Sequence, residues 1–455
     1  MTRPALLLLL VVLTALAAGA PAAEAAAPKP LRLSWVRCFS LNAAPCPGTQ
    51  TVVADGALKL AAVAGPRARI LWRDKRGRER RTRPWWRTGT RIWVRVPKWA
   101  ASGPVRVVEG RRRSNPRQVS VEQPLGSAAA AFGGDAMWIW QLEKVEGGDP
   151  DAIISRARAA GLEAVFVKAA DGGSLWSQFS SELIARLKAA GLRVCAWQYV
   201  YGADPEKEAA TAAAAIARGA DCFVIDAESE YEGRYAAAQR YVGALRTAVG
   251  PAFPIALSTF PYVNYHPSFP YSVFLGPGAA QANLPQMYWK AIGVTPDRIF
   301  EATYSTNLPY DRPILPLGQL YEAPTVGDVQ RFRALATGYG ARGVSWWSWQ
   351  HASGIDWQAA FGQPAPAAVP ATPTWVAIGP GSRGDLVIRA QELLRGGGAA
   401  LPVSGSYGSL TEAAIRGLQT ARGLPETGAV DEATWRELLR FAPEPADWAA
   451  QAARR

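Results

Sequence analysis

Two acidic side chains, two positions apart, offer the clearest chemistry in this sequence. In the segment Val224-Ile225-Asp226-Ala227-Glu228, hydrophobic residues lead into carboxylates at alternate positions. Residues two apart on a strand face the same side, with α-carbons roughly 6.5 to 7 Å apart, so both carboxylates would enter one pocket. Paired carboxylates push their ionisations apart, which leaves one protonated to act as an acid. Asp226 and Glu228 are therefore candidate catalytic residues for glycoside hydrolysis; a structural ion pair with Lys168 is the alternative.

These carboxylates need a scaffold, and residues 133–362 supply alternating strand-like and helix-like segments. The candidate strands are Met137–Gln141, Ala164–Ala170, Val194–Val200, Cys222–Glu228, Ile255–Phe260, Leu284–Trp289, Ile314–Gln319 and Val344–Gln350. The helical patterns include Asp151–Ala160, Ser180–Ala190, Pro205–Ala217 and Thr325–Gly338, whereas residues 271–281 offer only a short helix. Strict alternation predicts parallel strands, and eight such units predict a (β/α)8 TIM barrel.

Polar side chains gather where these strands end, which is where a barrel of this kind places its working residues. Tryptophan faces suit stacking on sugar rings, although filling a core is their ordinary role. The candidate substrate-binding residues are Gln141, Lys168, Asp171, Gln198, Tyr199, Glu230, Gln286, Tyr288, Trp289, Gln319, Trp347 and Gln350.

Three stretches of the barrel region resemble the glycoside hydrolase family 25 lysozymes. They are Phe166–Gly172, Asp226-Ala227-Glu228, and the eighth strand, which is rich in Trp and Gln. The resemblance implies that Glu228 is the general acid and that Asp226 orients the substrate's 2-acetamido group as an internal nucleophile. The family carries an Asp at the end of the first strand, where this chain has Trp140-Gln141. The charge set is therefore incomplete, which puts activity in question.

Residues 374–442 predict a compact C-terminal module. Apolar residues at helical spacing indicate three short helices between Gly381 and Leu439, hence a three-helix bundle. Thr411 and Asp431 are placed to cap the second and third helices. The stretches Gly405-Ser406-Tyr407-Gly408, Ala414-Ile415, Leu418-Gln419, Gly423-Leu424 and Thr434-Trp435 resemble the peptidoglycan-binding domain 1 family. The resemblance implies a non-catalytic tether to peptidoglycan.

The region from 31 to 123 contains short alternating runs separated by Gly and Pro, which predicts a β-sandwich. Within it, the segment from Val94 to Val108 resembles immunoglobulin-like IPT/TIG modules. Between Arg67 and Arg117 there are eighteen Lys or Arg residues against three acidic ones, a local balance of +15 in a chain of net charge +13. Such a patch indicates a polyanionic partner, with a plain solvated surface as the alternative.

The N-terminal segment predicts export. Arg3 precedes an apolar run from Ala5 to Ala18, and small-residue cleavage patterns follow, so residues 1–27 read as a signal peptide. An uncleaved anchor is the alternative, and no later stretch is apolar for long enough to span a membrane. Export favours anionic wall polymers or lipid head groups over nucleic acid as partners of the basic region. A Pro- and Ala-rich linker, 363–373, precedes the C-terminal module.

An exported protein is permitted disulfides. Cys38 and Cys46 lie close together in the sequence and are expected to be bonded, whereas Cys195 and Cys222 would be buried thiols at least as readily as a bridge. No cysteine has metal-ligand spacing with either histidine, so no metal or cofactor is expected.

Three functions remain open from the sequence. The first is a secreted, cell-wall-associated glycosidase that cleaves peptidoglycan strands. The second is an inert wall-binding protein whose barrel has lost its chemistry with the missing first-strand Asp. The third is a hydrolase of another extracellular polysaccharide, held on the wall by the C-terminal module.

Overall fold

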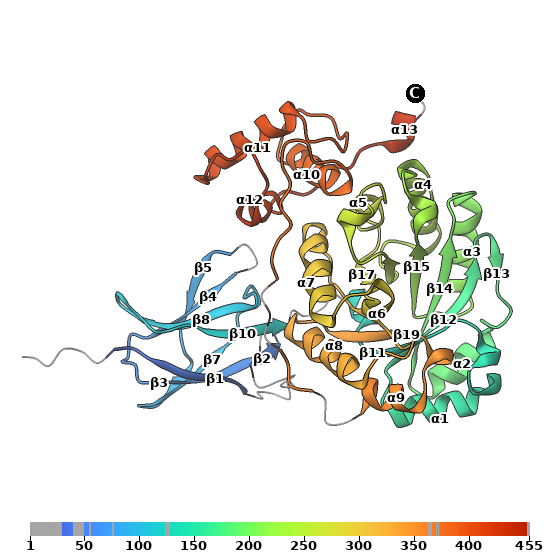
Figure 1. The fold of residues 1–455 in the computed structure, drawn as a ribbon, viewed down its shortest axis with the longest axis horizontal. Helices are drawn as coiled ribbons and strands as arrows, with labels where there is room; N and C mark the ends of the chain where they lie inside the picture. The colour runs from blue at the N-terminus through green and yellow to red at the C-terminus, as the bar shows by residue number, and fades with distance from the viewer. Residues whose placement is uncertain are drawn as a thin grey trace, which may run out of the picture. The chain divides into compact units, whose positions relative to one another are not determined.

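The computed structural model describes residues 30–39, 50–53, 56–74, 77–122, 128–362, 366–369, 371 and 373–452 (Figure 1). The chain divides into two units, Met1–Pro30 and Leu31–Arg455. The expected signal peptide lies outside the described residues, and so does Cys46, so the bond between Cys46 and Cys38 stays a prediction. Among the helices in the described ranges, none is long and apolar enough to cross a membrane.

The N-terminal region forms two β-sheets in which all but one strand pair is antiparallel. The first sheet has the order β1 (Leu33–Phe39), β3 (Ala57–Ala62), β7 (Arg91–Arg95), β6 (Trp86–Arg87). The second has the order β2 (Thr51–Val53), β10 (Arg117–Glu122), β8 (Gly103–Glu109), β4 (Arg69–Arg73), β5 (Glu79–Thr82), with β9 (Arg112–Arg113) paired to β8. Leu58 and Leu60 of the first sheet share one hydrophobic core with Trp72 and Val107 of the second. The antiparallel sheets expected for this region are therefore present.

The central region forms a mostly parallel, barrel-like sheet. Its strands, in spatial order, are β17 (Ala282–Pro285), β16 (Ile255–Thr259), β15 (Cys222–Ala227), β14 (Arg193–Val200), β12 (Ala164–Asp171), β11 (Gly134–Ile139), β19 (Gly343–Trp347) and β18 (Leu317–Gln319). The short β13 (Ser174–Leu175) pairs antiparallel with β12. Isolated parallel bridges join Asn283 to Ile314 and Gln286 to Leu317, which links the two ends of this order.

Helices alternate with these strands along the chain and surround the sheet (Figure 1). They are α1 (Pro150–Ala160), α2 (Ser181–Ala189), α3 (Pro205–Ala217), α4 (Tyr235–Val249), α5 (Tyr271–Phe274), α6 (Trp289–Ile292), α7 (Pro296–Asn307), α8 (Val326–Gly338) and α9 (Gly354–Phe361). Residues 271–281, for which the sequence predicted only a short helix, contain α5, a single helical turn.

Side-chain alternation gives the sheet two cores. Trp138, Phe166 and Trp197 belong to an inner cluster enclosed by the strands, whereas the neighbouring residues on the same strands pack outward against the helices. Cys195 and Cys222 also face inward, at paired positions of β14 and β15. They form a disulfide, which the sequence had left open against two free thiols.

The C-terminal module contains α10 (Asp385–Gly396), α11 (Ser409–Arg422), α12 (Glu432–Leu438) and α13 (Trp448–Ala452). Asp431 caps α12 as predicted, because its side chain accepts a hydrogen bond from the Thr434 amide at 2.8 Å. The predicted cap at Thr411 is wrong, because α11 already begins at Ser409. The buried Thr411 hydroxyl instead accepts a hydrogen bond from Gln391 on α10 at 3.0 Å.

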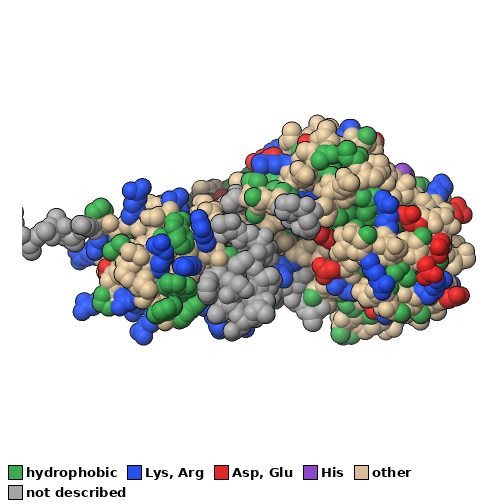
Figure 2. Space-filling view, turned by 90° about the horizontal axis from the view of Figure 1, so that it is seen from below, with side chains coloured by type: hydrophobic (Ala, Val, Ile, Leu, Met, Phe, Trp, Pro, Cys, Tyr) green, Lys and Arg blue, Asp and Glu red, His purple; other side chains and the backbone are tan. Residues whose placement is uncertain are grey.

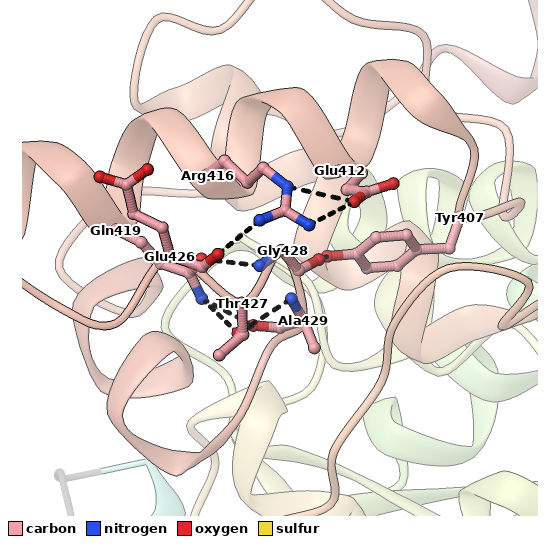
Figure 3. Close-up of polar contacts among 8 residues, drawn as sticks. All are labelled: Tyr407, Glu412, Arg416, Gln419, Glu426, Thr427, Gly428 and Ala429. Carbon is pink, nitrogen blue, oxygen red and sulfur yellow. Dashed lines mark hydrogen bonds and ion pairs between the residues drawn. The ribbon is translucent and has the colours of Figure 1, made fainter.

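The loop between α11 and α12 is held by side chains from within the module (Figure 3). Gln419 accepts a hydrogen bond from the Gly428 amide at 2.9 Å and donates one to the Ala429 carbonyl at 2.8 Å. Tyr407 donates to the Gly428 carbonyl at 2.7 Å. Arg416 joins the Glu412 carboxylate, at 2.8 Å, to a backbone carbonyl of the loop. The loop conformation therefore depends on a few buried polar contacts.

Gln419→Leu is expected to destabilise the C-terminal module by about 2 kcal/mol, because it leaves the buried Gly428 amide without its partner and removes one hydrogen bond from the Ala429 carbonyl. Thermal unfolding of the full chain should show the transition of this module at lower temperature. Glu426→Gln is the matched control, because only its backbone carbonyl takes part in the network. An unchanged transition in Gln419→Leu would contradict the importance of these contacts.

Candidate active site

The two candidate catalytic carboxylates meet at the end of β15. Asp226 faces the inside of the sheet, and Glu228 comes directly after β15, two residues beyond Asp226. Gln286 comes directly after β17, and its side-chain nitrogen donates to Asp226 Oδ1 at 3.0 Å and to Glu228 Oε1 at 2.9 Å. Both hydrogens of one amide group are thus shared between the two carboxylates. The structure brings together three residues that the sequence had placed on two separate strands.

Burial shifts the acidity of this pair in one direction. It raises the pKa of Asp226 well above its usual range; the nearby Glu228 charge adds to this increase, while Lys168 opposes it. Burial also raises the pKa of Glu228; the Gln286 hydrogen bond opposes this shift and Glu230 adds to it. Two carboxyl groups so close together favour a state in which one of them keeps its proton. The pair can therefore supply a proton above the usual pH range of a carboxylic acid.

Lys168 on β12 lowers the pKa of Asp226 by its charge, but its direct contacts are with other residues. Its ammonium group forms an ion pair with Asp171 at 2.5 Å and lies over the rings of Trp176 and Trp197, at 4.6 and 4.8 Å from their centroids. The register between β12 and β14 shifts after Lys168, so that Asp171 lies opposite the inward-facing Tyr199. The direct partner of Lys168 is therefore Asp171, and its effect on Asp226 acts over a longer distance.

Three tyrosines complete the polar wall of the site. Tyr199 donates to Glu230 at 2.8 Å, and Tyr201 donates to Asp171 at 2.8 Å, which together with burial raises the pKa of Tyr201 to about 12. Burial and the charge of Asp226 raise the pKa of Tyr288 well above its usual range. These phenols therefore remain protonated, so each keeps a hydrogen to donate.

Glu230→Gln is expected to shift the pH profile of any activity that needs protonated Glu228. The Glu230 charge raises the pKa of Glu228, so its removal lowers that pKa. An acid with a lower pKa loses its proton earlier as pH rises, so the alkaline limb of the profile should move to lower pH. Glutamine can still accept the Tyr199 hydrogen bond, which preserves the local geometry. A measured alkaline limb that stays in place or moves to higher pH would contradict this electrostatic assignment.

Other predicted site residues support loops near the mouth of the sheet. Gln350 accepts hydrogen bonds from the backbone amides of Trp140 and Gln141, at 3.1 and 3.0 Å. Trp347 is half-buried and lies against the Trp140 ring, with centroids 6.3 Å apart. Gln319 is fully buried, and its oxygen accepts from the Lys290 amide at 2.8 Å. Gln350 and Gln319 thus hold backbone instead of facing an open pocket.

Gln198 and Trp289 are not brought to the cluster. Gln198 is fully buried on the outward face of β14, where it donates to the Gly172 and Glu208 carbonyls at 2.6 and 3.0 Å. Trp289 lies in the outer core against Phe332, with ring centroids 5.0 Å apart. Strand alternation explains why Gln198 points away from the site: it is adjacent to the inward-facing Tyr199, so its side chain lies on the opposite face of β14.

A hollow of about 630 Å³ opens between the loops that follow β11 and β12. Gln141 and Trp176 line it, and so does Gln178, which donates to the carbonyls of Trp140 and Lys168 at 2.8 and 2.9 Å. Sequence reasoning missed Gln178 because it lies well beyond the end of its strand. Gln141 lies at the end of the first strand, where the sequence lacks an Asp, and it contributes an uncharged side chain to the wall of this hollow.

Comparison with known proteins identifies one region of the chain by sequence. Residues 383–438 match the family model described as a putative peptidoglycan binding domain. No curated protein matches the chain.

Several solved structures resemble the chain at low identity. A chitinase from Chromobacterium violaceum ATCC 12472 is 13% identical, with 50% of this chain and 98% of that chain covered and a TM-score of 0.37. A class V chitinase from Pseudomonas fluorescens Pf-5 is 13% identical, with coverage of 50% and 99% and a TM-score of 0.39. A family 25 glycosyl hydrolase from Bacillus anthracis is 13% identical, with coverage of 33% and 69% and a TM-score of 0.25.

Proposed function

We propose that the protein hydrolyses glycosidic bonds in the glycan strands of the cell wall, with its C-terminal module holding it on peptidoglycan. The observation that carries the proposal is the single Gln286 amide that joins the carboxylates of Asp226 and Glu228. Their raised pKa values support acid catalysis at a pH above the usual range of a carboxylic acid. The match of residues 383–438 to a peptidoglycan binding domain supports the choice of substrate.

In this proposal Glu228 donates its proton to the leaving oxygen of the glycosidic bond. Asp226 accepts a hydrogen bond from the N–H of the substrate's 2-acetamido group, whose carbonyl oxygen then attacks the anomeric carbon. Asp226 is the more deeply buried of the two. An incoming N–H donor stabilises its charged form, which leaves the shared proton on Glu228. Substrate binding itself would thus assign the two roles.

Attack by the substrate's own acetamido oxygen supports a retaining reaction. Water then displaces that oxygen from the opposite face, so the anomeric carbon is inverted twice and ends in its original configuration. We expect the first product to keep the configuration of the substrate's anomeric carbon. Proton NMR of the products before mutarotation would test this, and initial release of the opposite anomer would contradict it.

The wider proposal keeps the finer assignments of the sequence. They are an eightfold (β/α) barrel over residues 133–362, a three-helix bundle at the C-terminus, and a secreted, wall-associated protein. Lys168, Asp171, Tyr199 and Tyr288 are proposed to contact the sugar. The hollow beside Trp176 offers room for glycan units next to the cleaved bond.

Purified murein sacculi test the proposal directly. The full-length wild-type protein should release new reducing ends and lower the turbidity of the suspension. Binding to sacculi without any new reducing ends would support the inert wall-binding alternative instead. If other polysaccharides are cleaved and sacculi are not, the third alternative holds.

A further inference from the structure

A second candidate binding site lies on the N-terminal sheets, in a part of the chain that the proposed hydrolase does not use. A hollow of about 420 Å³ is lined by Arg69, Arg83 and Arg87 together with Trp85 and Trp86. The two tryptophan side chains are unusually open, with 45% and 58% of their surfaces exposed. Large exposed aromatic surfaces beside cationic groups are features of ligand-binding surfaces.

The aromatic part of this hollow is held in place by the neighbouring strand. Trp86 in β6 stacks on Trp93 in β7, with ring centroids 4.8 Å apart and an angle of 27°. The Trp85 amide donates to the Trp93 carbonyl at 3.1 Å. Because its backbone and one ring are already ordered, the hollow loses little entropy when a flat ligand binds.

Among the described residues, the ion pairs of this region leave out the arginines that line the hollow. The acidic side chains Asp74, Glu79 and Glu109 each pair with another arginine, at 3.2, 3.0 and 3.6 Å. Within the described ranges, no acidic side chain pairs with Arg83 or Arg87. On the face shown in Figure 2, blue side chains are spread over the N-terminal sheets and red ones are few, whereas the two colours mix over the barrel-like region. The positive charge of Arg83 and Arg87 can therefore attract an anionic partner.

Arg69 differs from these two arginines because its guanidinium is anchored. Its Nη1 donates to the Ala68 carbonyl at 2.9 Å, and this bond fixes the orientation of the whole guanidinium group. A fixed guanidinium can form paired hydrogen bonds with a carboxylate or a phosphate group. The hollow therefore combines flat apolar surfaces with at least one positioned anion-binding group.

The geometry points to a sugar polymer bearing carboxylate or phosphodiester groups as the occupant of this hollow. The tryptophan faces fit the C–H faces of sugar rings or polyol units, and the arginines fit the repeated anionic groups. The match of residues 383–438 to a peptidoglycan binding domain favours a wall glycopolymer over other polyanions. The inference does not depend on the proposed hydrolysis, because no residue of the hollow belongs to the candidate active site.

Binding of the full-length protein to soluble polygalacturonate, and separately to poly(glycerol phosphate), tests the inference. Dextran serves as the uncharged control polymer. We expect binding to both anionic polymers at about 50 mM salt, none to dextran, and strong weakening at about 500 mM salt because the charges are exposed to screening. Equal binding to dextran would overturn the role of charge. Binding to only one anionic polymer would identify which anionic group the site accepts.

Variants distinguish binding at this hollow from nonspecific attraction to the basic surface. Arg83→Gln with Arg87→Gln should weaken binding about tenfold, and Trp85→Ala about fivefold. Arg32→Gln with Arg73→Gln removes the same charge from exposed positions outside the hollow and should weaken binding no more than about twofold. Equal losses in both arginine pairs would overturn the site.

Two sets of controls test whether the variants stay folded and whether other polyanions bind as well. Thermal unfolding should be unchanged in the arginine variants, and Trp86→Phe, which keeps a ring against Trp93, provides an aromatic variant if Trp85→Ala fails to fold. Single-stranded DNA and vesicles of anionic phospholipid test other polyanions. Tighter binding to either of them than to both anionic sugar polymers would overturn the assignment to a glycopolymer.

Discussion

Glu228→Gln is expected to lower kcat on peptidoglycan glycan by about a thousandfold, which is within the range for loss of a general acid. Glutamine has nearly the same shape as protonated glutamic acid but cannot transfer a proton to the leaving oxygen. Its side-chain oxygen can still accept the hydrogen bond from Gln286, so the local geometry should persist. The rate of reducing-end release under saturating substrate measures the loss.

A substrate with a good leaving group makes this prediction more specific. A phenolic leaving group needs little protonation, so an aryl glycoside of N-acetylated sugar should be cleaved by Glu228→Gln with a much smaller loss. Glu206→Gln is the control, because Glu206 is an exposed residue on α3 that pairs with Arg240. Equal rates for wild type and Glu228→Gln on peptidoglycan would rule out the acid assignment, even if both proteins were active.

Asp226→Asn is expected to lower kcat by about a hundredfold or more, because a neutral amide stabilises the developing charge on the acetamido group less than a carboxylate does. Asparagine can still accept from Gln286 through its oxygen, so the side chain should keep its position. Loss of the neighbouring carboxylate also removes the repulsion within the pair. In the proposed substrate-bound state Asp226 is ionised and its charge holds the proton on Glu228, so in Asp226→Asn the alkaline limb of kcat should move to lower pH.

The pH profile distinguishes this electrostatic role from simple damage to the fold. Asp151→Asn, an exposed change on α1 at a residue paired with Arg186, should leave both rate and profile unchanged. A rate loss in Asp226→Asn without any change in profile would contradict the coupling of the two carboxylates. A rate near that of wild type would contradict its proposed role with the acetamido group.

Strand periodicity explains why part of the site was predictable. A spacing of two residues along an extended segment was enough to place Asp226, on β15, and Glu228, directly after it, in one site. The same rule argues against Gln198, which is out of phase with Tyr199, yet its polar character at a strand end made it a candidate. Trp289 was mistaken for the end of a strand, whereas β17 ends at Pro285 and a helical turn begins at Trp289. The turn rotates the indole into the outer core.

The sequence by itself determined the alternation of strands and helices, the acidic pair and the helical C-terminal module, because each depends on local periodicity or on residues a few positions apart. Tertiary structure alone decided that Gln286 joins the two carboxylates, that Lys168 pairs with Asp171, and that Cys195 bonds Cys222. The Gln286 and cysteine contacts join different strands, and the Lys168 contact depends on a shift in strand register. Such contacts depend on how strands align in space, which the spacing along one strand does not specify.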